Sequence, residues 1–163
     1  MTNSLFPELS KQSKKNEDER GSLEILYESN AMVLKRSFSK KGVFRGLHLQ
    51  SSPHKQTKLI RVVEGEIIDF IIDPNNEKNQ IHWRKIDSKN DWILIAPDFA
   101  HGFYALTDTI FEYICDGAYN EESEQSYSIT DFLKKTMGIN ELILSEKDLN
   151  ALQLPVNHAH MEM

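Results

Sequence analysis

The sequence predicts an all-β domain of the sandwich or barrel type. Between residues 22 and 115, short runs rich in β-branched and aromatic residues alternate with turn residues. Many short strands at close, regular intervals are typical of these folds. The expected strands cover residues 23–28, 32–38, 43–49, 57–63, 66–73, 81–86, 92–95, 102–107 and 110–115.

Length and composition fit one such domain. The chain has 163 residues, of which 39% are apolar, and its mean hydropathy is −0.50. The apolar residues come in blocks separated by charged stretches, which indicates a real core. We expect a flexible N-terminal arm over residues 1–18, a single β domain over 19–152, and a C-terminal tail over 153–163.

Two turns divide the central strands. Gly65 tolerates a positive φ, so we predict a tight hairpin that pairs Lys58–Val63 with Glu66–Ile72. The second turn is Asp73–Asn76. Residues 66–72 and 92–95 are apolar almost throughout, which is typical of strands covered on both faces. Such coverage favours a homodimer.

Two short helices are expected after residue 119. The first spans Asp131–Met137 and stops at Gly138, a common residue after a helix end. The second begins after Ser145, whose side chain is the predicted N-cap, with Asp148 at the third helical position.

Charge and cysteine content exclude several classes of protein. Lys and Arg number 19 against 25 Asp and Glu, so the net charge of −6 offers no basic surface for nucleic acid. The single cysteine, Cys115, excludes an internal disulfide and a multi-cysteine zinc site. No apolar run approaches a membrane span, and the first residues lack the apolar segment of a secretory signal. We therefore expect a cytoplasmic protein that binds neither nucleic acid nor membrane.

The histidines raise the question of a metal site. In His48-Leu49-Gln50, glutamine stands where a His-x-His pair of ligands would need its second histidine. His158 and His160 do form such a pair, but in a polar tail. We predict no stoichiometric metal ion at His48 and His101, because two good ligands are too few for a stable site.

Strand 43–49 places a histidine beside a glycine. Strict alternation sends Arg45 to one face and Gly46, His48 and Gln50 to the other, so that Gly46 leaves space beside His48. A lone strand histidine is either a core residue bonded to the backbone or a functional one. Polar and ionisable groups at neighbouring strand ends, in Gln56–Lys58 and Pro97–Gly102, favour the functional alternative.

Five motifs resemble the dTDP-4-dehydrorhamnose 3,5-epimerase family, in the family's order and over about residues 18–152. They are Gly42-Val-Phe-Arg-Gly-Leu-His-Leu-Gln50, Gln56-Thr-Lys-Leu-Ile-Arg-Val-Val-Glu-Gly-Glu66, Ile95-Ala-Pro-Asp-Phe-Ala-His-Gly-Phe103, Glu112-Tyr113-Ile-Cys115 with Tyr119, and Leu144-Ser-Glu-Lys-Asp148. The resemblance implies an antiparallel double-stranded β-helix (a cupin-like jelly roll), usually dimeric, whose chemistry needs no metal and no diffusible cofactor.

The resemblance also implies a reaction. The family acts on a nucleotide-linked 4-keto-6-deoxy sugar, in which the C4 carbonyl acidifies the protons on C3 and C5. A base removes one of these protons, an enolate forms, and an acid returns a proton to the opposite face. An isomerase of deoxysugar biosynthesis for surface polysaccharide or glycoconjugate is therefore expected.

Four positions match the family's catalytic groups. His48 matches the general base and Asp148 the carboxylate that orients it, although Asp148 also has a purely structural interpretation within its helix. Lys58 matches the cation beside the developing enolate oxygen, where a fixed charge lowers the barrier. Tyr113 matches the acid on the other side of the sugar ring.

Other positions match substrate contacts. The pocket contacts are Gln50, His101 and Tyr119, and the basic residues matched to the diphosphate are Arg45, Arg20 and Lys147. Arginine suits that role because its planar fork can bond two phosphate oxygens. The resemblance further implies a homodimer in which Arg20 reaches the partner's site.

Departures from the family pattern fall mainly on substrate contacts. Val33 and Lys35 stand where the family carries Gln and Asn, ahead of Ser37-Phe38-Ser39. Contacts to the base or the diphosphate are therefore expected to differ. The nucleotide, the sugar, and inversion at C3 alone or at both carbons stay open. So do two other functions: a sugar-nucleotide 3,4-ketoisomerase, which would carry a histidine in place of Gln50, and a non-catalytic sugar-nucleotide-binding cupin.

Overall fold

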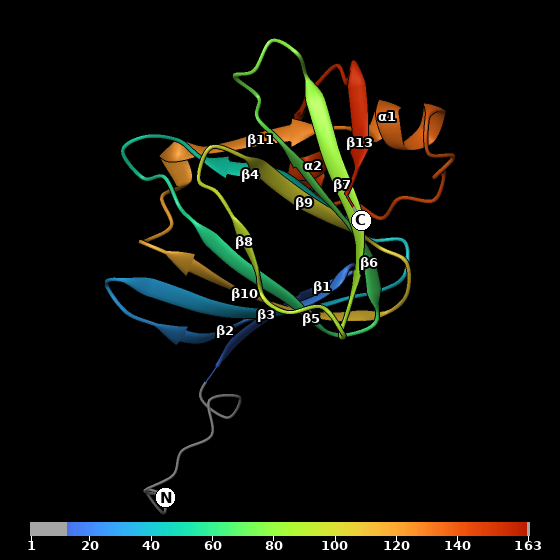
Figure 1. Cartoon of the computed structure of the whole chain (residues 1–163). Helices are drawn as coiled ribbons and strands as arrows, with labels where there is room; N and C mark the ends of the chain where they lie inside the picture. Colours follow the sequence, from blue (N-terminus) through green and yellow to red (C-terminus); the bar gives the residue numbers. More distant parts are fainter. Residues whose placement is uncertain (1–12, 163) are drawn as a thin grey trace, which may run out of the picture.

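Two curled β-sheets pack face to face in the computed structural model, which describes residues 13–162 (Figure 1). The first sheet has six strands in the order β1-β2-β3-β10-β5-β8, and the second has seven in the order β12-β11-β4-β9-β6-β7-β13. The strands of the first sheet are β1 (Lys14–Asp18), β2 (Gly21–Glu28), β3 (Met32–Ser39), β5 (Lys58–Glu64), β8 (Ile93–Ile95) and β10 (Thr109–Asp116).

The second sheet carries most of the C-terminal elements. Its strands are β4 (Phe44–Gln50), β6 (Glu66–Ile72), β7 (Gln80–Asp87), β9 (Ala100–Ala105), β11 (Glu124–Ser128), β12 (Leu152–Gln153) and β13 (His158–Met161). Helices α1 (Thr130–Lys135) and α2 (Glu146–Leu149) accompany it, with a 3-10 turn at Glu121–Ser123. Neighbouring strands are antiparallel, apart from the β11–β12 and β7–β13 pairs. The predicted all-β jelly roll with short C-terminal helices is confirmed.

Every strand expected between residues 22 and 115 is present, but the hairpin prediction at Gly65 is wrong. Strand β5 belongs to the first sheet and β6 to the second, so the chain crosses between sheets at Gly65. There Gly65 has φ of 93°, and a Cβ would lie 2.4 Å from the carbonyl oxygen of Asp108. A corner packed this closely against a distant loop cannot be distinguished from a tight turn by local sequence.

The predicted arm and tail are corrected where the structure describes them. Residues 14–18 form β1, antiparallel to β2, and are therefore not a loose arm; residues 1–12 lie outside the described part. In the expected tail, β13 pairs with the edge strand β7, and the Glu162 amide donates to the Trp83 carbonyl at 2.8 Å. Pairing at a sheet edge uses backbone groups, so polar sequences can supply it.

The seven-stranded sheet separates two apolar cores. On its outer face, Phe44, Leu47 and Phe70 pack against Phe132 and Leu133 of α1. Between the sheets, a smaller core includes Ile60, Phe103 and Phe111. Strand β6 contributes to both cores and is covered on both faces, as its apolar sequence predicts. Within residues 13–162, neither helix has the length and apolarity required to cross a bilayer.

Substitution of Gly65 tests the corner. Gly65→Ala places a methyl group against backbone in a left-handed conformation, so we expect a loss of about 2–4 kcal/mol in the free energy of unfolding. Gly138→Ala is the matched control, because Gly138 also has a positive φ (68°) but has open space around it. It should cost only about 1 kcal/mol in urea denaturation. Equal losses of unfolding free energy in Gly65→Ala and Gly138→Ala would show that the corner at Gly65 is not sterically restricted.

Candidate functional site

A cavity of about 350 Å³ opens between the two sheets. Eight of the predicted site residues line it: Arg20, Arg45, His48, Lys58, His101, Tyr113, Tyr119 and Lys147. They come from both sheets, from α2 and from the connections that carry Arg20 and Tyr119, so the topology gathers groups that are far apart in the sequence. Asp148 lies behind His48, and Gln50 is buried outside the cavity wall with its side-chain oxygen unpaired among the described residues.

Strand β4 departs from the strict alternation predicted for it. Arg45 and His48 both line the cavity, whereas Phe44, Leu47 and Leu49 enter the outer core. The β4–β9 register shifts between Arg45 and His48. At this point Gly46 has φ of 105°, and a Cβ there would lie 2.6 Å from the His101 carbonyl oxygen. The irregularity therefore brings two predicted site residues, Arg45 and His48, to one face instead of opposite faces.

His48 is held by a buried carboxylate. Its Nε2 lies 2.7 Å from Asp148 Oδ1, and the other oxygen of Asp148 accepts from the Gly46 amide at 3.3 Å. Ser145 caps α2 as predicted, since its hydroxyl accepts from the Asp148 amide. Burial alone would raise the pKa of Asp148, but the hydrogen bond and charge of His48, with contacts to Gly46 and Ser145, lower it. Asp148 is therefore an ionised orienting group.

A second histidine–carboxylate pair lies on neighbouring strands. His101 Nε2 is 2.6 Å from Asp69 Oδ1, and both side chains are buried. His101 stands opposite His48 in the β4–β9 ladder. Sequence reasoning missed Asp69, although a carboxylate in the otherwise apolar strand β6 is a signal that could have identified it.

Lys58 and Tyr113 present unpaired polar ends to the cavity. Within residues 13–162 neither the Lys58 amine nor the Tyr113 hydroxyl has a hydrogen bond or ion pair. Burial lowers the pKa of Lys58, and the charge of Lys35 acts in the same direction. Burial raises the pKa of Tyr113 well above its ordinary value, so Tyr113 is a protonated phenol at neutral pH.

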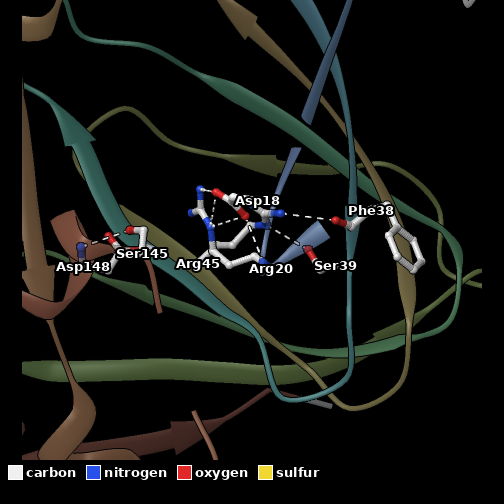
Figure 2. A network of polar contacts seen from close by, with 8 residues as sticks. Asp18, Arg20, Phe38, Ser39, Arg45, Ser145 and Asp148 are labelled. Atoms are coloured by element: carbon white, nitrogen blue, oxygen red, sulfur yellow. Dashed lines mark hydrogen bonds and ion pairs between the residues drawn. The ribbon is translucent and has the colours of Figure 1, made fainter. Parts of the chain in front are cut away.

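Two of the residues that line the cavity, Arg20 and Arg45, lie beside each other (Figure 2). Arg45 donates to Ser39 Oγ at 2.8 Å and to the Phe38 carbonyl at 3.2 Å, while Arg20 is paired with Asp18. Burial, followed by the charge of Arg20, lowers the pKa of Arg45. Arg20 lines the cavity of this chain, where β1 folds back on β2 and Asp18 holds its guanidinium. Its approach to a partner's site stays a prediction.

Glu124, which also lines the cavity, links three predicted residues. It accepts from Tyr119 Oη at 2.5 Å and from Lys147, and it lies 3.8 Å from His48 Nδ1. Burial would raise its pKa, but the hydrogen bonds from Lys147 and Tyr119 and the charge of His48 lower it. Sequence reasoning missed Glu124, since nothing in the acidic stretch around it distinguishes it from Glu121 or Glu122.

His101 pairs with one carboxylate, Asp69, whereas His48 lies between Asp148 at 2.7 Å and Glu124 at 3.8 Å. Over the described range, no group of three or more His, Cys, Asp or Glu side chains has metal-binding geometry. The absence of a stoichiometric metal at His48 and His101 stays a prediction.

Comparison with known proteins identifies the family. The family model described as dTDP-4-dehydrorhamnose 3,5-epimerase matches residues 9–155. The chain belongs to this family. A curated member from Methanothermobacter thermautotrophicus is 33% identical, over 88% of this chain and 88% of its own.

Solved structures of family members share the fold. The epimerase from Sulfolobus tokodaii is 33% identical, with a TM-score of 0.65 over 85% of each chain. The epimerase from Bacillus anthracis, solved with TDP and PPi bound, is 29% identical, with a TM-score of 0.68 over 87% of this chain and 91% of its own. The Legionella pneumophila enzyme, solved with dTDP-4-keto-L-rhamnose, is 31% identical, with a TM-score of 0.62 over 87% of this chain and 84% of its own.

The Asp148 pair predicts a pH dependence of stability. Because the folded-state pKa of Asp148 lies below its unfolded value, its stabilising contribution is complete above the unfolded pKa and is lost as pH falls through the folded pKa. Asp148→Asn should lower the free energy of unfolding by about 1–3 kcal/mol near pH 6. The difference in free energy of unfolding between Asp148→Asn and wild type should become smaller towards about pH 3.

Urea denaturation at a series of pH values measures this gap. Asp98→Asn is the control, because Asp98 is exposed and pairs with Lys55 at the surface. It should change stability by less than about 1 kcal/mol at every pH. A gap for Asp148→Asn that stays constant with pH would contradict the assigned ionisation.

Proposed function

We propose that this chain is an isomerase that epimerises a nucleoside-diphosphate-linked 4-keto-6-deoxy sugar. The observation that carries the proposal is the placement of His48 with Asp148, Lys58 and Tyr113 around one cavity. Proton abstraction next to a ketone needs a base, a cation for the enolate oxygen and an acid on the opposite face. In our proposal His48, Lys58 and Tyr113 supply these three groups, and membership of the epimerase family supports this assignment.

His48 and Tyr113 occupy opposite walls. His48 comes from β4 in the seven-stranded sheet and Tyr113 from β10 in the six-stranded sheet. In our proposal the neutral imidazole of His48 takes the proton from carbon, and the carboxylate of Asp148 stabilises the imidazolium that forms. Tyr113 then donates its phenolic proton from the other face, which inverts the carbon.

Lys58 is the proposed partner of the enolate oxygen. Its amine has no hydrogen bond or ion pair with any described residue and lies in the cavity wall, so its charge is available to the substrate. In a site shielded from water, one such interaction contributes about 3–4 kcal/mol to transition-state stabilisation. His101, held by Asp69, is a neighbouring polar group that orients the sugar.

We propose that the diphosphate is bound by three basic residues of the cavity, Arg45, Arg20 and Lys147. Tyr119 is a further proposed contact of the substrate. Gln50 is buried outside the cavity wall in this structure. Its proposed contact with the substrate therefore requires a rearrangement of the side chains around it. We place the enzyme in the cytoplasm, in deoxysugar biosynthesis. Deuterium uptake at C3 and C5 of a panel of 4-keto sugar nucleotides in D2O tests the reaction by NMR.

That experiment separates the alternatives. A 3,4-ketoisomerase would form a 3-keto product, and a non-catalytic binding protein would produce no exchange. With the 4-keto group retained, exchange and inversion at C3 alone would identify a 3-epimerase, and exchange and inversion at both carbons a 3,5-epimerase.

Substitution of His48 and Tyr113 tests their separate roles. His48→Asn should abolish both deuterium exchange and turnover, because no proton leaves carbon. Tyr113→Phe should retain exchange on the original face and lose inversion, because the base is intact and the opposite acid is missing.

Matched controls are available at the surface. His54→Asn and Tyr27→Phe change an exposed histidine and an exposed tyrosine, and both should leave exchange and turnover unchanged. Equal loss of exchange in His48→Asn and Tyr113→Phe, with substrate still bound, would contradict the division of roles.

We also propose a homodimer formed through the outer face of the six-stranded sheet. Leu34, Ile114, Leu59 and Leu94 are successive cross-strand neighbours on that face, and Leu94 is 64% exposed. A continuous apolar row of this kind is typical of subunit interfaces.

Light scattering should give twice the chain mass of 18.9 kDa. Leu94→Glu should shift the protein towards monomer, whereas Leu152→Glu, on the small β12 strand, should not. A monomeric wild type at micromolar concentration would overturn the dimer.

A further inference from the structure

A second cavity, of about 200 Å³, is linked to the candidate site by one hydrogen bond. Its walls come from β6 and β7 of one sheet and β8 of the other. Asp69 lines this second cavity, whereas His101 lines the first. His101 Nε2 and Asp69 Oδ1, 2.6 Å apart, join the two. The His101–Asp69 pair therefore connects the two cavities.

Asp69 is a buried carboxylate that its histidine satisfies only in part. It is 5% exposed, in a strand that is otherwise largely apolar. A neutral imidazole donates to one carboxylate oxygen but carries no charge, and the other oxygen of Asp69 has no hydrogen bond within residues 13–162. A buried carboxylate is costly unless a cation lies near it. The charge of Asp69 acts on Lys58, but the proposed function assigns Lys58 to the enolate oxygen.

Arg84 supplies a cation in the second cavity. It lines that cavity together with Asp69 and stands directly opposite Asp69 in the β6–β7 ladder. The Cβ atoms of such opposite residues are about 5 Å apart. Arg84 has no hydrogen bond or ion pair with any other described residue, and its Nε is buried. Its guanidinium is therefore not committed to another acid and acts on Asp69 by charge across the cavity.

The elements packed against the pair present further titratable groups. They are His48 of β4, Lys58 of β5, Tyr113 of β10, His82 of β7 and Glu162, which follows β13. In the second cavity, Glu162 Oε1 lies 3.2 Å from His82 Nδ1, so these two groups are engaged with each other. Among the described residues of that cavity, Arg84 is the charge without a partner.

The charge beside Asp69 determines what His101 offers to the main cavity. An ionised carboxylate only accepts hydrogen bonds, so the Nε2 of His101 must donate to it. In the neutral ring the other nitrogen, Nδ1, is then a free acceptor, and uptake of a proton would turn it into a donor. A cation near Asp69 opposes that uptake, because it stabilises the more negative state of the pair. Arg84 thus favours the acceptor form.

We infer that Arg84 is a positioning residue that acts through Asp69. Its charge holds the pair with Asp69 ionised and His101 neutral, so that His101 presents a hydrogen-bond acceptor to a hydroxyl group of the sugar. The use of this acceptor by a substrate rests on the proposed function. The action of Arg84 on the pair does not, and it can be measured without substrate.

NMR titration of the full-length, 15N-labelled protein tests the inference. The ring signals of His101 are assigned by their loss in His101→Gln and followed between about pH 5 and pH 9. In Arg84→Met the midpoint of the His101 titration should rise by about 0.5–1.5 pH units, because a positive charge across the cavity is removed. Arg84→Gln, which also removes the charge, should reproduce the rise. Arg84→Lys, which keeps the charge, should restore most of the wild-type midpoint.

The matched control is Lys85→Met, which removes an exposed lysine next to Arg84 on β7 but outside the cavity. It should leave the His101 midpoint unchanged, and the exposed His54 gives an internal reference in every variant. Thermal unfolding verifies that each variant is folded. A wild-type midpoint in both Arg84→Met and Arg84→Gln would overturn the inference, because a residue that only packs would give that result. An equal rise in Lys85→Met would also overturn it. Neither result would affect the proposed function, which the deuterium experiment tests separately.

Discussion

The close approach of β4 to β9 determines the geometry of the site. A Cβ on Gly46 would lie 2.6 Å from the His101 carbonyl oxygen, and one on Gly102 would lie 2.4 Å from the Arg45 carbonyl oxygen. Two glycines therefore allow backbones to meet where side chains would keep them apart. The register shift at this point turns Arg45 and His48 to the same cavity and directs the Gly46 amide at Asp148.

The two histidines of the cavity depend on different layers of the fold. His48 is oriented by Asp148 from α2, outside the seven-stranded sheet, whereas His101 is oriented by Asp69 from the neighbouring strand β6. Each carboxylate is buried, so each is satisfied by its histidine rather than by water. The orientation of His48 consequently depends on the packing of α2 against the sheet. The contact between Asp148 and His48 therefore contributes both to stability and to the geometry of the cavity.

Local sequence predicted the strands well because β-branched runs and turn residues act within a few positions. It failed at Gly65, where a distant loop decides which sheet the chain enters next, and at β13, where backbone pairing alone holds a polar segment. At the site, the family motifs located the residues of the cavity wall. Asp69 and Glu124 were missed, because their contacts are with residues distant in the sequence: His101 for Asp69, and His48 and Lys147 for Glu124.

The cations that line the cavity differ in whether a carboxylate compensates them. Arg20 and Lys147 have carboxylate partners, so the chain itself compensates their desolvation. Arg45 bonds only neutral oxygens, and Lys58 and Lys35 have no acidic partner among the described residues. Keeping unpaired cations in a buried wall costs stability, a cost that native proteins tolerate mainly at functional sites. In the proposed function, a substrate that carries a diphosphate and develops an enolate supplies the negative charge that these three groups lack.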